Sequence, residues 1–495
     1  MARLPLYPIS ARFRTTAIYC VMVLSTIGLF LLIRHYGELL VPPPAHHSAL
    51  LSHTTAAPQV DVLWHILLVL VVVIVTGRAI GRVFLFMQQP PVIGEVIAGI
   101  LLGPSFLGRL APEVSAYLLP PAVAPFLGVI AQMGIILYML YMFMVGLELD
   151  TGILRKRVHA TVAISHASII APFLLGSLLA LVLYPRLSAS DVPFTNFALF
   201  LGVAMSITAF PVLARILTDR QMSTTDIGVM ALTCAATVDV TAWCLLAFVV
   251  GVAQAQISGA LLVTALTLLY VGVMFVIVQP MIMRRLSSIG EEPLSQRLVA
   301  LVFVGLFLSA LSTESIGIHS IFGAFLLGAV IPHDSAVARG FRAKLEDLVA
   351  IVLLPAFFAF TGMRTQIGLV TGAEQWVVCG LIILVATAGK FGGSFVAARL
   401  TGLSRGYAAA LGVLMNTRGL MELIVLNIGL DLGVISPRLF AMMVLMALVT
   451  TLATTPVLEL LMPRLESRSG RLAAGREGAE SPEIALSTSP RRHNA

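Results

Sequence analysis

The stretch "SITAFPVLAR", residues 206–215, lies inside an apolar segment long enough to cross a lipid bilayer, yet it carries a proline and two hydroxyl side chains. Pro211 removes an amide donor and so frees a carbonyl in mid-segment. A second apolar segment is interrupted in "LMNTRGLMEL", residues 414–423, which includes Asn416 and Gly419. One such break is usually a kink that neighbouring helices satisfy. Two breaks in separate segments favour an ion site built from unwound helices.

Composition places both breaks in a membrane protein. Of the 495 residues, 58% are hydrophobic and only 11% are charged, and the mean hydropathy is +0.99. Repeated apolar runs of about 20 residues predict an all-α polytopic fold, because backbone polar groups in hydrocarbon must be satisfied within each segment. We predict fourteen spans, at about 15–36, 61–78, 89–104, 122–147, 159–184, 196–217, 226–253, 259–283, 298–314, 318–334, 346–366, 375–398, 407–432 and 438–462.

The basic residues set the predicted orientation. With the N-terminus inside, 24 Lys and Arg residues fall in cytoplasmic segments and five fall outside, namely Arg34, Arg109, Arg186, Arg364 and Arg438. Basic residues concentrate on the cytoplasmic side of membrane proteins. The sequence therefore predicts an inner (plasma) membrane protein with both termini in the cytoplasm. Because the basic residues concentrate on the cytoplasmic side of the membrane, the net charge of +7 does not indicate a nucleic-acid partner.

The two ends of the chain are predicted to lie outside the main membrane domain. Residues 1–60 would form an extra helix and an external linker, and a retained helix is favoured over a signal peptide because its apolar stretch is long. Residues 61–462 would form the membrane domain, and the polar segment 463–495 a disordered tail. The four cysteines fall within predicted spans and are interpreted as small apolar residues: Cys20, Cys234, Cys244 and Cys379.

Four ionisable residues are predicted inside spans: Asp239, Lys390, Arg418 and Glu422. A charge at the bilayer centre costs roughly 2.5–3.5 kcal/mol on insertion scales, so such residues pair, face a cavity or mark a pathway. A purely structural Asp239–Lys390 ion pair is one alternative. Lysine usage favours a functional role, because only three of the 31 basic residues are lysines and lysine can lose its proton when buried, whereas arginine does not.

The two interrupted spans are the sixth and the thirteenth. A separation of seven spans gives them opposite directions across the membrane, which is the geometry of an inverted-topology repeat. We predict repeats over about 61–253 and 298–462, with the eighth span as a connector.

Several motifs together resemble the second family of monovalent cation:proton antiporters. They occur in matching order between about residues 61 and 462, and they are "QPPVIGEVIAGILLGPSFLG" (89–108), "FMVGLELD" (143–150), "SITAFPVLARIL" (206–217), "AATVDVTAW" (235–243), "IFGAFLLGAVIP" (321–332), "LLPAFFAFTGMRT" (353–365) and "GVLMNTRGLMELIVLNIG" (412–429). The resemblance implies an antiporter fold of about thirteen helices with two crossed, unwound helices, plus one extra N-terminal helix. It also implies a homodimer embedded in lipid.

The same resemblance implies roles for individual residues. Asp239 would bind the cation (Na⁺ or K⁺) and the proton in alternation, with Lys390 as its charge partner. Thr208 would line the site, and Arg418 and Glu422 would form a polar pair on the second broken helix.

One position departs from the family pattern. Family members usually carry a polar or acidic residue just before the key aspartate, and this chain has Val238 there. A valine cannot ligate an ion, which favours a one-carboxylate site and electroneutral exchange. Thr237 and Thr241 are candidates to supply hydroxyl oxygens in its place.

Other functions remain open on the sequence alone. On the same fold the chain could be a potassium efflux protein, a channel-like leak or an exporter of a small charged metabolite. A sensory or structural role is disfavoured, because no soluble domain is evident. An intramembrane enzyme would need a zinc motif or paired aspartates, and neither occurs. The histidines in spans or at their ends lack metal-ligand spacing, so we expect no metal, cofactor or enzymatic activity: His166, His319 and His333.

Overall fold

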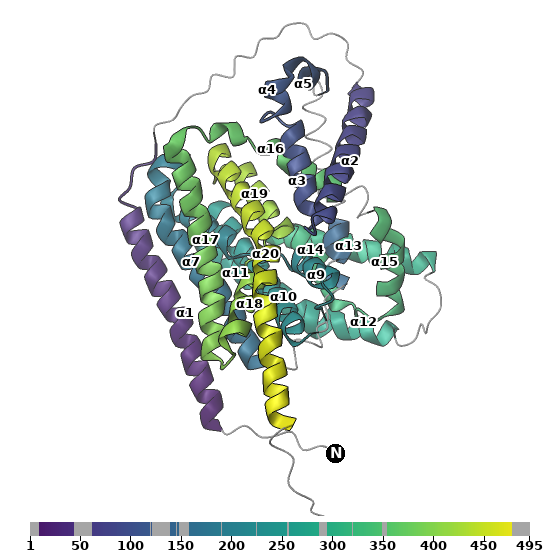
Figure 1. Cartoon of the computed structure of the whole chain (residues 1–495). Helices are drawn as coiled ribbons and strands as arrows, with labels where there is room; N and C mark the ends of the chain where they lie inside the picture. The colour runs from purple at the N-terminus through teal and green to yellow at the C-terminus, as the bar shows by residue number, and fades with distance from the viewer. Residues whose placement is uncertain are drawn as a thin grey trace, which may run out of the picture.

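The computed structural model is helical throughout its described parts (Figure 1). It describes residues 9–43, 62–118, 120, 139–144, 146–147, 158–189, 191–223, 225–254, 257–286, 295–318, 320–348 and 354–477. Within them, nine helical segments are long and apolar enough to span a membrane: Cys20–Gly37, Trp64–Phe86, Pro91–Leu110, Thr161–Leu187, Asp226–Ala253, Ala265–Arg285, Gln296–Ile316, Gly372–Leu400 and Pro437–Leu461. The span predicted at 122–147 lies mostly outside the described residues.

The helices that carry these segments mostly extend beyond the predicted spans. They are α1 (Ile9–Gly37), α2 (Val62–Phe86), α3 (Pro91–Leu102), α7 (Val158–Leu187), α10 (Asp226–Gln254), α11 (Ile257–Val273), α12 (Gln279–Leu286), α13 (Gln296–Ile316), α17 (Gly372–Leu400) and α20 (Pro437–Glu477). A π-helical turn, Met274–Val278, joins α11 to α12.

The two spans with breaks are each divided into two half-helices. The first consists of α8 (Phe194–Ser206) and α9 (Phe210–Asp219), and the second of α18 (Arg405–Met415) and α19 (Leu420–Asp431). The predicted interruptions are therefore confirmed in position. Each half-helix is too short to cross a bilayer alone, so each pair crosses it as a unit.

Five shorter helices refine or correct the predicted boundaries. The span predicted at 318–334 is helical only as α14 (Ser320–Val330), and a separate helix α15 (Ala336–Leu348) follows it. The basic residues of α15 alternate with apolar ones, so its pattern is amphipathic and does not suit a span. Helix α16 (Leu354–Arg364) occupies part of the span predicted at 346–366, and α4 (Leu107–Leu110) and α5 (Pro112–Leu118) lie between predicted spans.

The C-terminal helix differs from the expectation for the tail. Helix α20 continues to Glu477, into the segment 463–495 for which disorder is predicted. Residues 478–495 lie outside the described part of the chain.

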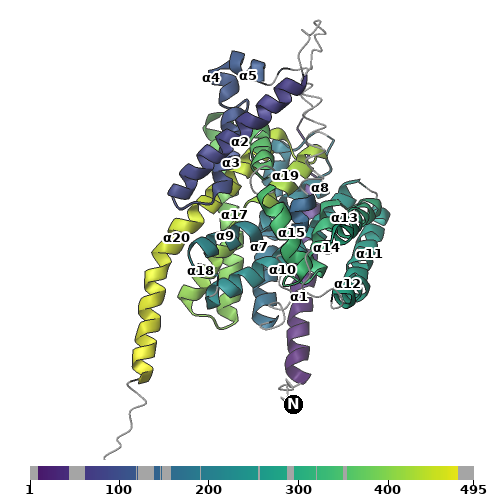
Figure 2. The same ribbon diagram turned by 90° about the vertical axis from the view of Figure 1, so that its right-hand side faces the viewer.

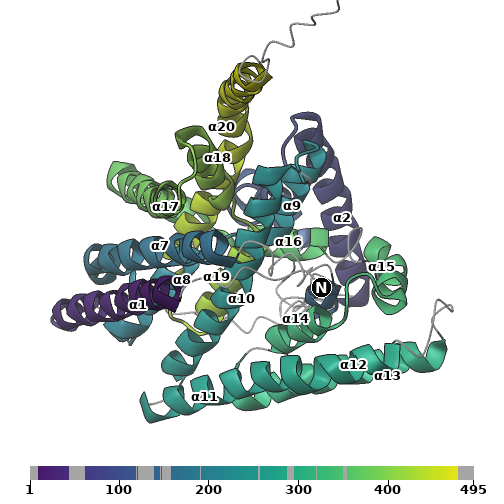
Figure 3. The same cartoon turned by 90° about the horizontal axis from the view of Figure 1, so that it is seen from below.

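The helices form three groups. In the central group, α7 contacts α8, α10 and α17, and α17 contacts α18 and α20. A second group consists of α2, α3 and α16, and a third is built on α13 with α11 and α14. In Figure 3, α11, α12 and α13 form a row along one side, and α10 lies between that row and α7. Figure 2 shows α2 and α3 beside the upper part of α20.

Close backbone contact holds the second group together. A Cβ atom on Gly99 of α3 would lie 2.0 Å from the carbonyl oxygen of Ala359 on α16, and one on Gly362 would lie 2.2 Å from that of Val96. Only glycine permits this approach from both helices. Small residues at helix crossings are a main source of packing energy in lipid, where the hydrophobic effect does not drive helix association.

The extra N-terminal helix packs on the central group. Helix α1 runs along α7 (Figure 1), and the rings of Phe30 and Phe173 lie 5.7 Å apart. In the last turn of α1, the Arg34 guanidinium donates to the carboxylate of Glu38, which follows the helix, at 2.6 Å, and this hydrogen bond lowers the pKa of Glu38. Thr195 of α8 also donates to Glu38, at 3.4 Å.

Candidate functional site: the crossing of two broken helices

The two breaks are hydrogen-bonded to each other. The Thr208 hydroxyl donates to the carbonyl of Met415 at 3.0 Å, and the amide of Ala209 donates to the carbonyl of Thr417, also at 3.0 Å. Backbone groups that leave the helical pattern in a buried place need such partners. The breaks at 207–209 and 416–419 therefore satisfy one another, and the two helices cross there.

Local sequence explains where each break falls. Ile207 and Ala209 have extended backbone angles, and Pro211 lies in the first turn of α9, where the missing amide costs no helical hydrogen bond. Asn416 follows the last residue of α18, and Gly419 directly precedes α19. All three residues predicted as helix breaks thus lie at half-helix ends.

Two buried basic side chains bind the C-terminal end of α8. The Lys390 ammonium, from α17, donates to the carbonyls of Ser168, at 3.0 Å, and Ser206. The Arg418 guanidinium donates to the carbonyls of Met205 at 2.9 Å and Ala204 at 3.3 Å. The last carbonyls of a helix lack intrahelical partners and carry partial negative charge, which these cations neutralise.

Arg418 also forms the polar pair expected with Glu422. Its guanidinium lies 3.2 Å from a Glu422 carboxylate oxygen, and both side chains are fully buried. The backbone amide of Arg418 donates to the Thr451 hydroxyl at 2.9 Å, and that hydroxyl donates back to the Arg418 carbonyl at 2.7 Å. The family resemblance anticipated the pair, and residues four apart share one face of a helix, whereas nothing in the sequence indicated Thr451.

Asp239 lies near the middle of α10 and is 1% exposed. Its Oδ1 atom has no hydrogen-bond partner in the described part of the protein. The Lys390 ammonium, its predicted charge partner, interacts electrostatically with the carboxylate and donates its hydrogen bonds to backbone carbonyls. Helix α10 contacts α8, α9 and α18, so the acid is carried by the helix that packs against both broken helices.

The two threonines near Asp239, Thr237 and Thr241, hydrogen-bond within their own helix. The Thr237 hydroxyl donates to the carbonyl of Thr233 at 2.9 Å, and Thr241 donates to that of Thr237 at 2.8 Å. Such bonds to the preceding turn are common for threonine in membrane helices. Each hydroxyl oxygen keeps a lone pair, so the geometry leaves a ligand role open.

Further unpartnered oxygens lie at the second break. The Asn416 Oδ1 and Thr417 Oγ1 atoms are buried and have no hydrogen-bond partner among the described residues. Sequence reasoning named Asn416 only as a helix break and gave Thr417 no role. No cluster of three or more His, Cys, Asp or Glu side chains that could hold a metal occurs in the described ranges.

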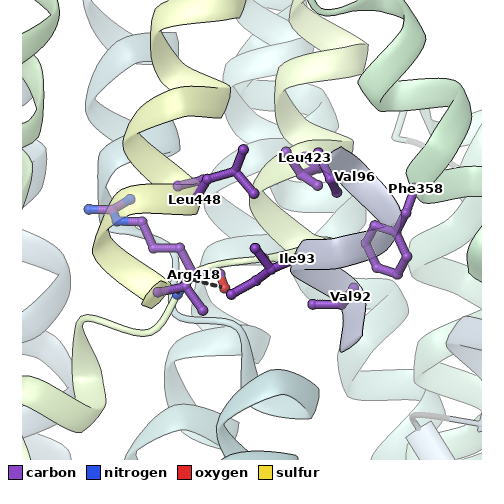
Figure 4. A pocket seen from close by; sticks show the side chains of 10 residues that line it. Val92, Ile93, Val96, Phe358, Arg418, Leu423 and Leu448 are labelled. Atoms are coloured by element: carbon purple, nitrogen blue, oxygen red, sulfur yellow. Dashed lines mark hydrogen bonds between the residues drawn. The ribbon is translucent and has the colours of Figure 1, made fainter. Parts of the chain in front are cut away.

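An apolar pocket borders the crossing without reaching the acid. It lies between α3, α16, α19 and α20, and its lining includes Ile93, Val96, Phe358 and Leu423 (Figure 4). The guanidinium of Arg418 points away from these side chains in Figure 4. The pocket thus lies where the second helix group meets the second broken helix, and no carboxylate lines it.

The match to a protein family decides the identification. The family described as "Sodium/hydrogen exchanger, transmembrane" matches residues 66–462. The chain belongs to this family. Its members are membrane antiporters that exchange cations for protons, and they are transporters and not enzymes. The resemblance predicted from the motifs is thereby confirmed.

Relatives at high identity support the assignment. The chain is 44% identical over 397 residues to "Na(+)/H(+) antiporter NhaS4" of Synechocystis sp., covering 80% of this chain and 96% of the relative. It is 40% identical to "Cation/H(+) antiporter 20" of Arabidopsis thaliana and 34% identical to "K(+)/H(+) antiporter 1" of Saccharomyces cerevisiae. In these two, the match covers 78% and 77% of this chain but only 47% and 44% of the longer relatives.

A solved exchanger structure has the same fold. The sodium proton antiporter MjNhaP1 from Methanocaldococcus jannaschii superimposes with a TM-score of 0.59 over 80% of this chain and 96% of that protein. At 13% identity this likeness concerns the fold alone. It confirms the predicted antiporter fold with two crossed, unwound helices.

Proposed function

We propose that this exchanger moves one monovalent cation, Na⁺ or K⁺, against one proton by alternating access at Asp239. The observation that carries the proposal is a fully buried carboxylate with an unpartnered oxygen, on the helix packed against both breaks. A buried carboxylate needs a neutralising partner. A proton or an alkali cation can each supply it, but not both at once.

The surroundings of Asp239 support electroneutral exchange. Val238 is fully buried next to it and brings no second acid. The Lys390 ammonium donates to the carbonyls of Ser168 and Ser206, so it already has partners within the fold. If Asp239 alone exchanges its proton, one cation moves against one proton and no net charge moves.

Alternating access follows if the central helix group moves when Asp239 is neutral. An uncompensated carboxylate would resist passage across an apolar barrier. The apolar pocket between α3, α16, α19 and α20 supports a sliding boundary there. The homodimer, the inner-membrane location and the cytoplasmic placement of both termini stay predictions.

The test is exchange in proteoliposomes that contain a pH-sensitive dye. We expect an outward cation gradient of Na⁺ or K⁺ to acidify the lumen at a rate that an imposed voltage leaves unchanged. The Asp239→Asn variant should lose exchange by at least about a hundredfold while inserting normally, because an amide cannot release or bind the proton. Asp334→Asn makes the same change at an exposed site and should retain full activity.

Three outcomes would contradict the proposal. Exchange by the Asp239→Asn variant at the wild-type rate would remove Asp239 from the mechanism. A rate that changes with voltage would exclude electroneutral exchange. Cation flux without proton movement would favour the potassium efflux alternative.

A further inference from the structure

Two half-helix C-termini meet at the crossing, and each carries the partial negative charge of its last carbonyls. Helix α8 ends at Ser206 and helix α18 ends at Met415. In a low-dielectric environment such an end attracts a cation strongly. The α8 end and the α18 end differ in the positive group that neutralises them.

The α8 end is already occupied by the protein's own cations. Lys390 binds the carbonyl of Ser206, and Arg418 binds those of Ala204 and Met205. Both side chains are fully buried. Each of these carbonyls already accepts a hydrogen bond from a cationic side chain, so the partial negative charge of this end is neutralised by the chain itself.

The α18 end has no basic side chain. The carbonyl of Met415 accepts only the neutral Thr208 hydroxyl, and the amide of Asn416 reaches back to the carbonyls of Val413 and Leu414. Among the described residues, no Lys or Arg side chain donates to the last turn of α18. This end therefore keeps its partial negative charge.

Unpartnered oxygens lie at the same end. Asn416 is 7% exposed and Thr417 is 0% exposed, and the side-chain oxygen of each lacks a hydrogen-bond partner in the described ranges. Buried polar atoms without partners are rare, and an unseen ion is one of the few explanations. A carboxamide oxygen and a hydroxyl oxygen are ligands that hard cations prefer.

The acid belongs to a helix that packs against this end. Helix α10 contacts α18, and Val238, the residue before Asp239, belongs to one buried cluster with Val413, Leu414 and Met415. The unpartnered Oδ1 of Asp239 therefore belongs to α10, the helix that packs against the C-terminal end of α18.

We propose that the transported cation binds between Asp239 and the C-terminal turn of α18, with the Asn416 carboxamide oxygen as a direct ligand and the Thr417 hydroxyl as a second. This inference rests on the proposed function and specifies its site. Where members of the family usually carry a polar or acidic residue, this chain has Val238, and the neutral carboxamide of Asn416 would supply a ligand oxygen in its place. It would add cation affinity without adding a site for a proton. Asn416 would therefore also help to set which alkali ion is preferred.

The test measures cation binding apart from transport. In purified protein, Na⁺ and K⁺ should raise the melting temperature with a midpoint set by their Kd, because a ligand of the folded state stabilises it. In Asn416→Ala we expect this midpoint, and the KM for the cation in proteoliposomes, to rise at least about tenfold, as for loss of a contact to a charged group. Alanine adopts the φ of −83° and ψ of 5° found at this position.

A merely structural role for Asn416 makes the opposite prediction for the cation-free protein. If Asn416 only capped α18, its removal would lower the melting temperature without cation and leave the cation midpoint unchanged. If it is a ligand, the melting temperature without cation should stay the same or rise, because an unsatisfied buried oxygen has been removed. Asn416→Asp keeps the shape and an oxygen. It should bind the cation more tightly at alkaline pH and shift the pH profile of exchange.

Thr417→Val has a matched control in Thr455→Val, since Thr455 is also buried with an unpartnered hydroxyl but lies on α20. We expect a raised KM only in Thr417→Val. A wild-type cation midpoint in Asn416→Ala, or an unaltered affinity and pH profile in Asn416→Asp if the alanine variant does not fold, would overturn the inference. If the inference about Asn416 fails but Asp239→Asn is inactive in the same assays, the proposed function still holds. An active Asp239→Asn would overturn the proposed function itself.

Discussion

The two broken helices look alike in sequence character but differ in how their charge is balanced. At α8 the C-terminal carbonyls bind Lys390 and Arg418, two side chains that the chain itself supplies. At α18 the corresponding turn receives only a hydroxyl, from Thr208. The α8 break is therefore neutralised by the chain itself, whereas the α18 break is the one at which we propose that the cation binds.

The N-terminal half-helices differ as well. The first turn of α19 contains the buried acid Glu422, whereas the first turn of α9 contains no acidic residue. A carboxylate is favourable at a helix N-terminus. Because Arg418 binds both the α8 end and Glu422, one guanidinium joins the charge balance of the two broken helices.

Removing that shared guanidinium should have the largest effect on stability. In Arg418→Met, Glu422 stays buried without its partner, and breaking a buried pair in this way typically costs about 3–5 kcal/mol. Unfolding titrations in mixed micelles measure the free energy of unfolding. The double variant Arg418→Met/Glu422→Gln removes both charges and should recover more than half of the loss. Equal losses in the single and double variants would show that the pair is not the source.

Replacing Lys390 should have the next largest effect. Lys390→Met leaves the carbonyls of Ser168 and Ser206 without donors, and an unsatisfied buried polar group costs about 1–3 kcal/mol. Lys344→Met is the control, because Lys344 is exposed on α15 and its loss should change stability little. The same unfolding titration applies. An unchanged free energy in Lys390→Met would mean that the α8 end does not depend on its cation, and the contrast between the two ends would disappear.

Much of the fold was predictable because its signals are local. Apolar run length located most helices, and Pro211 and Asn416 located the two breaks. The contact between Arg418 and Glu422, expected from the family resemblance, is also local, since residues four apart share one face of a helix.

The rest depended on contacts between distant segments. Lys390 was expected to be near Asp239, and it does interact with it electrostatically, but its hydrogen bonds to two carbonyls 222 and 184 residues away in sequence were not foreseen. Backbone carbonyls have no sequence signature, so nothing in the residue types could indicate them. The unpartnered oxygen of Asn416 was equally invisible, because a lack of partners is a property of the packed structure.

The hydrogen bond between the breaks should matter less than either cation. Thr208→Val keeps the side-chain volume but removes the donor to the Met415 carbonyl, and one neutral hydrogen bond contributes about 1 kcal/mol. Thr401→Val is the matched control, because the Thr401 hydroxyl bonds only to carbonyls of its own helix turn. If Thr208→Val were as costly as Lys390→Met, the α18 end would depend on its donor as strongly as the α8 end does.

The smallest effect on stability is expected at the outer boundary between α16 and α19. Arg364 of α16 lies 2.5 Å from the carboxylate of Asp431 and donates to the Asn427 side chain at 3.1 Å. The Arg364 and Asp431 side chains are 26% and 60% exposed, and solvent screens such pairs to about 0.2–1 kcal/mol. In Arg364→Gln we therefore expect a stability change below about 1 kcal/mol.

Transport should respond to this variant differently from stability. If the second broken helix must move past α16 during exchange, the contact opposes that step, and its loss should raise the maximal rate by up to about fivefold, the factor that corresponds to 1 kcal/mol. The KM for the cation should not change, because Arg364 touches neither Asp239 nor Asn416. A raised KM with an unchanged maximal rate would mean that Arg364 helps the cation to enter the site. It would also mean that α19 does not move past α16, so the motion would have to occur along another boundary of the central group.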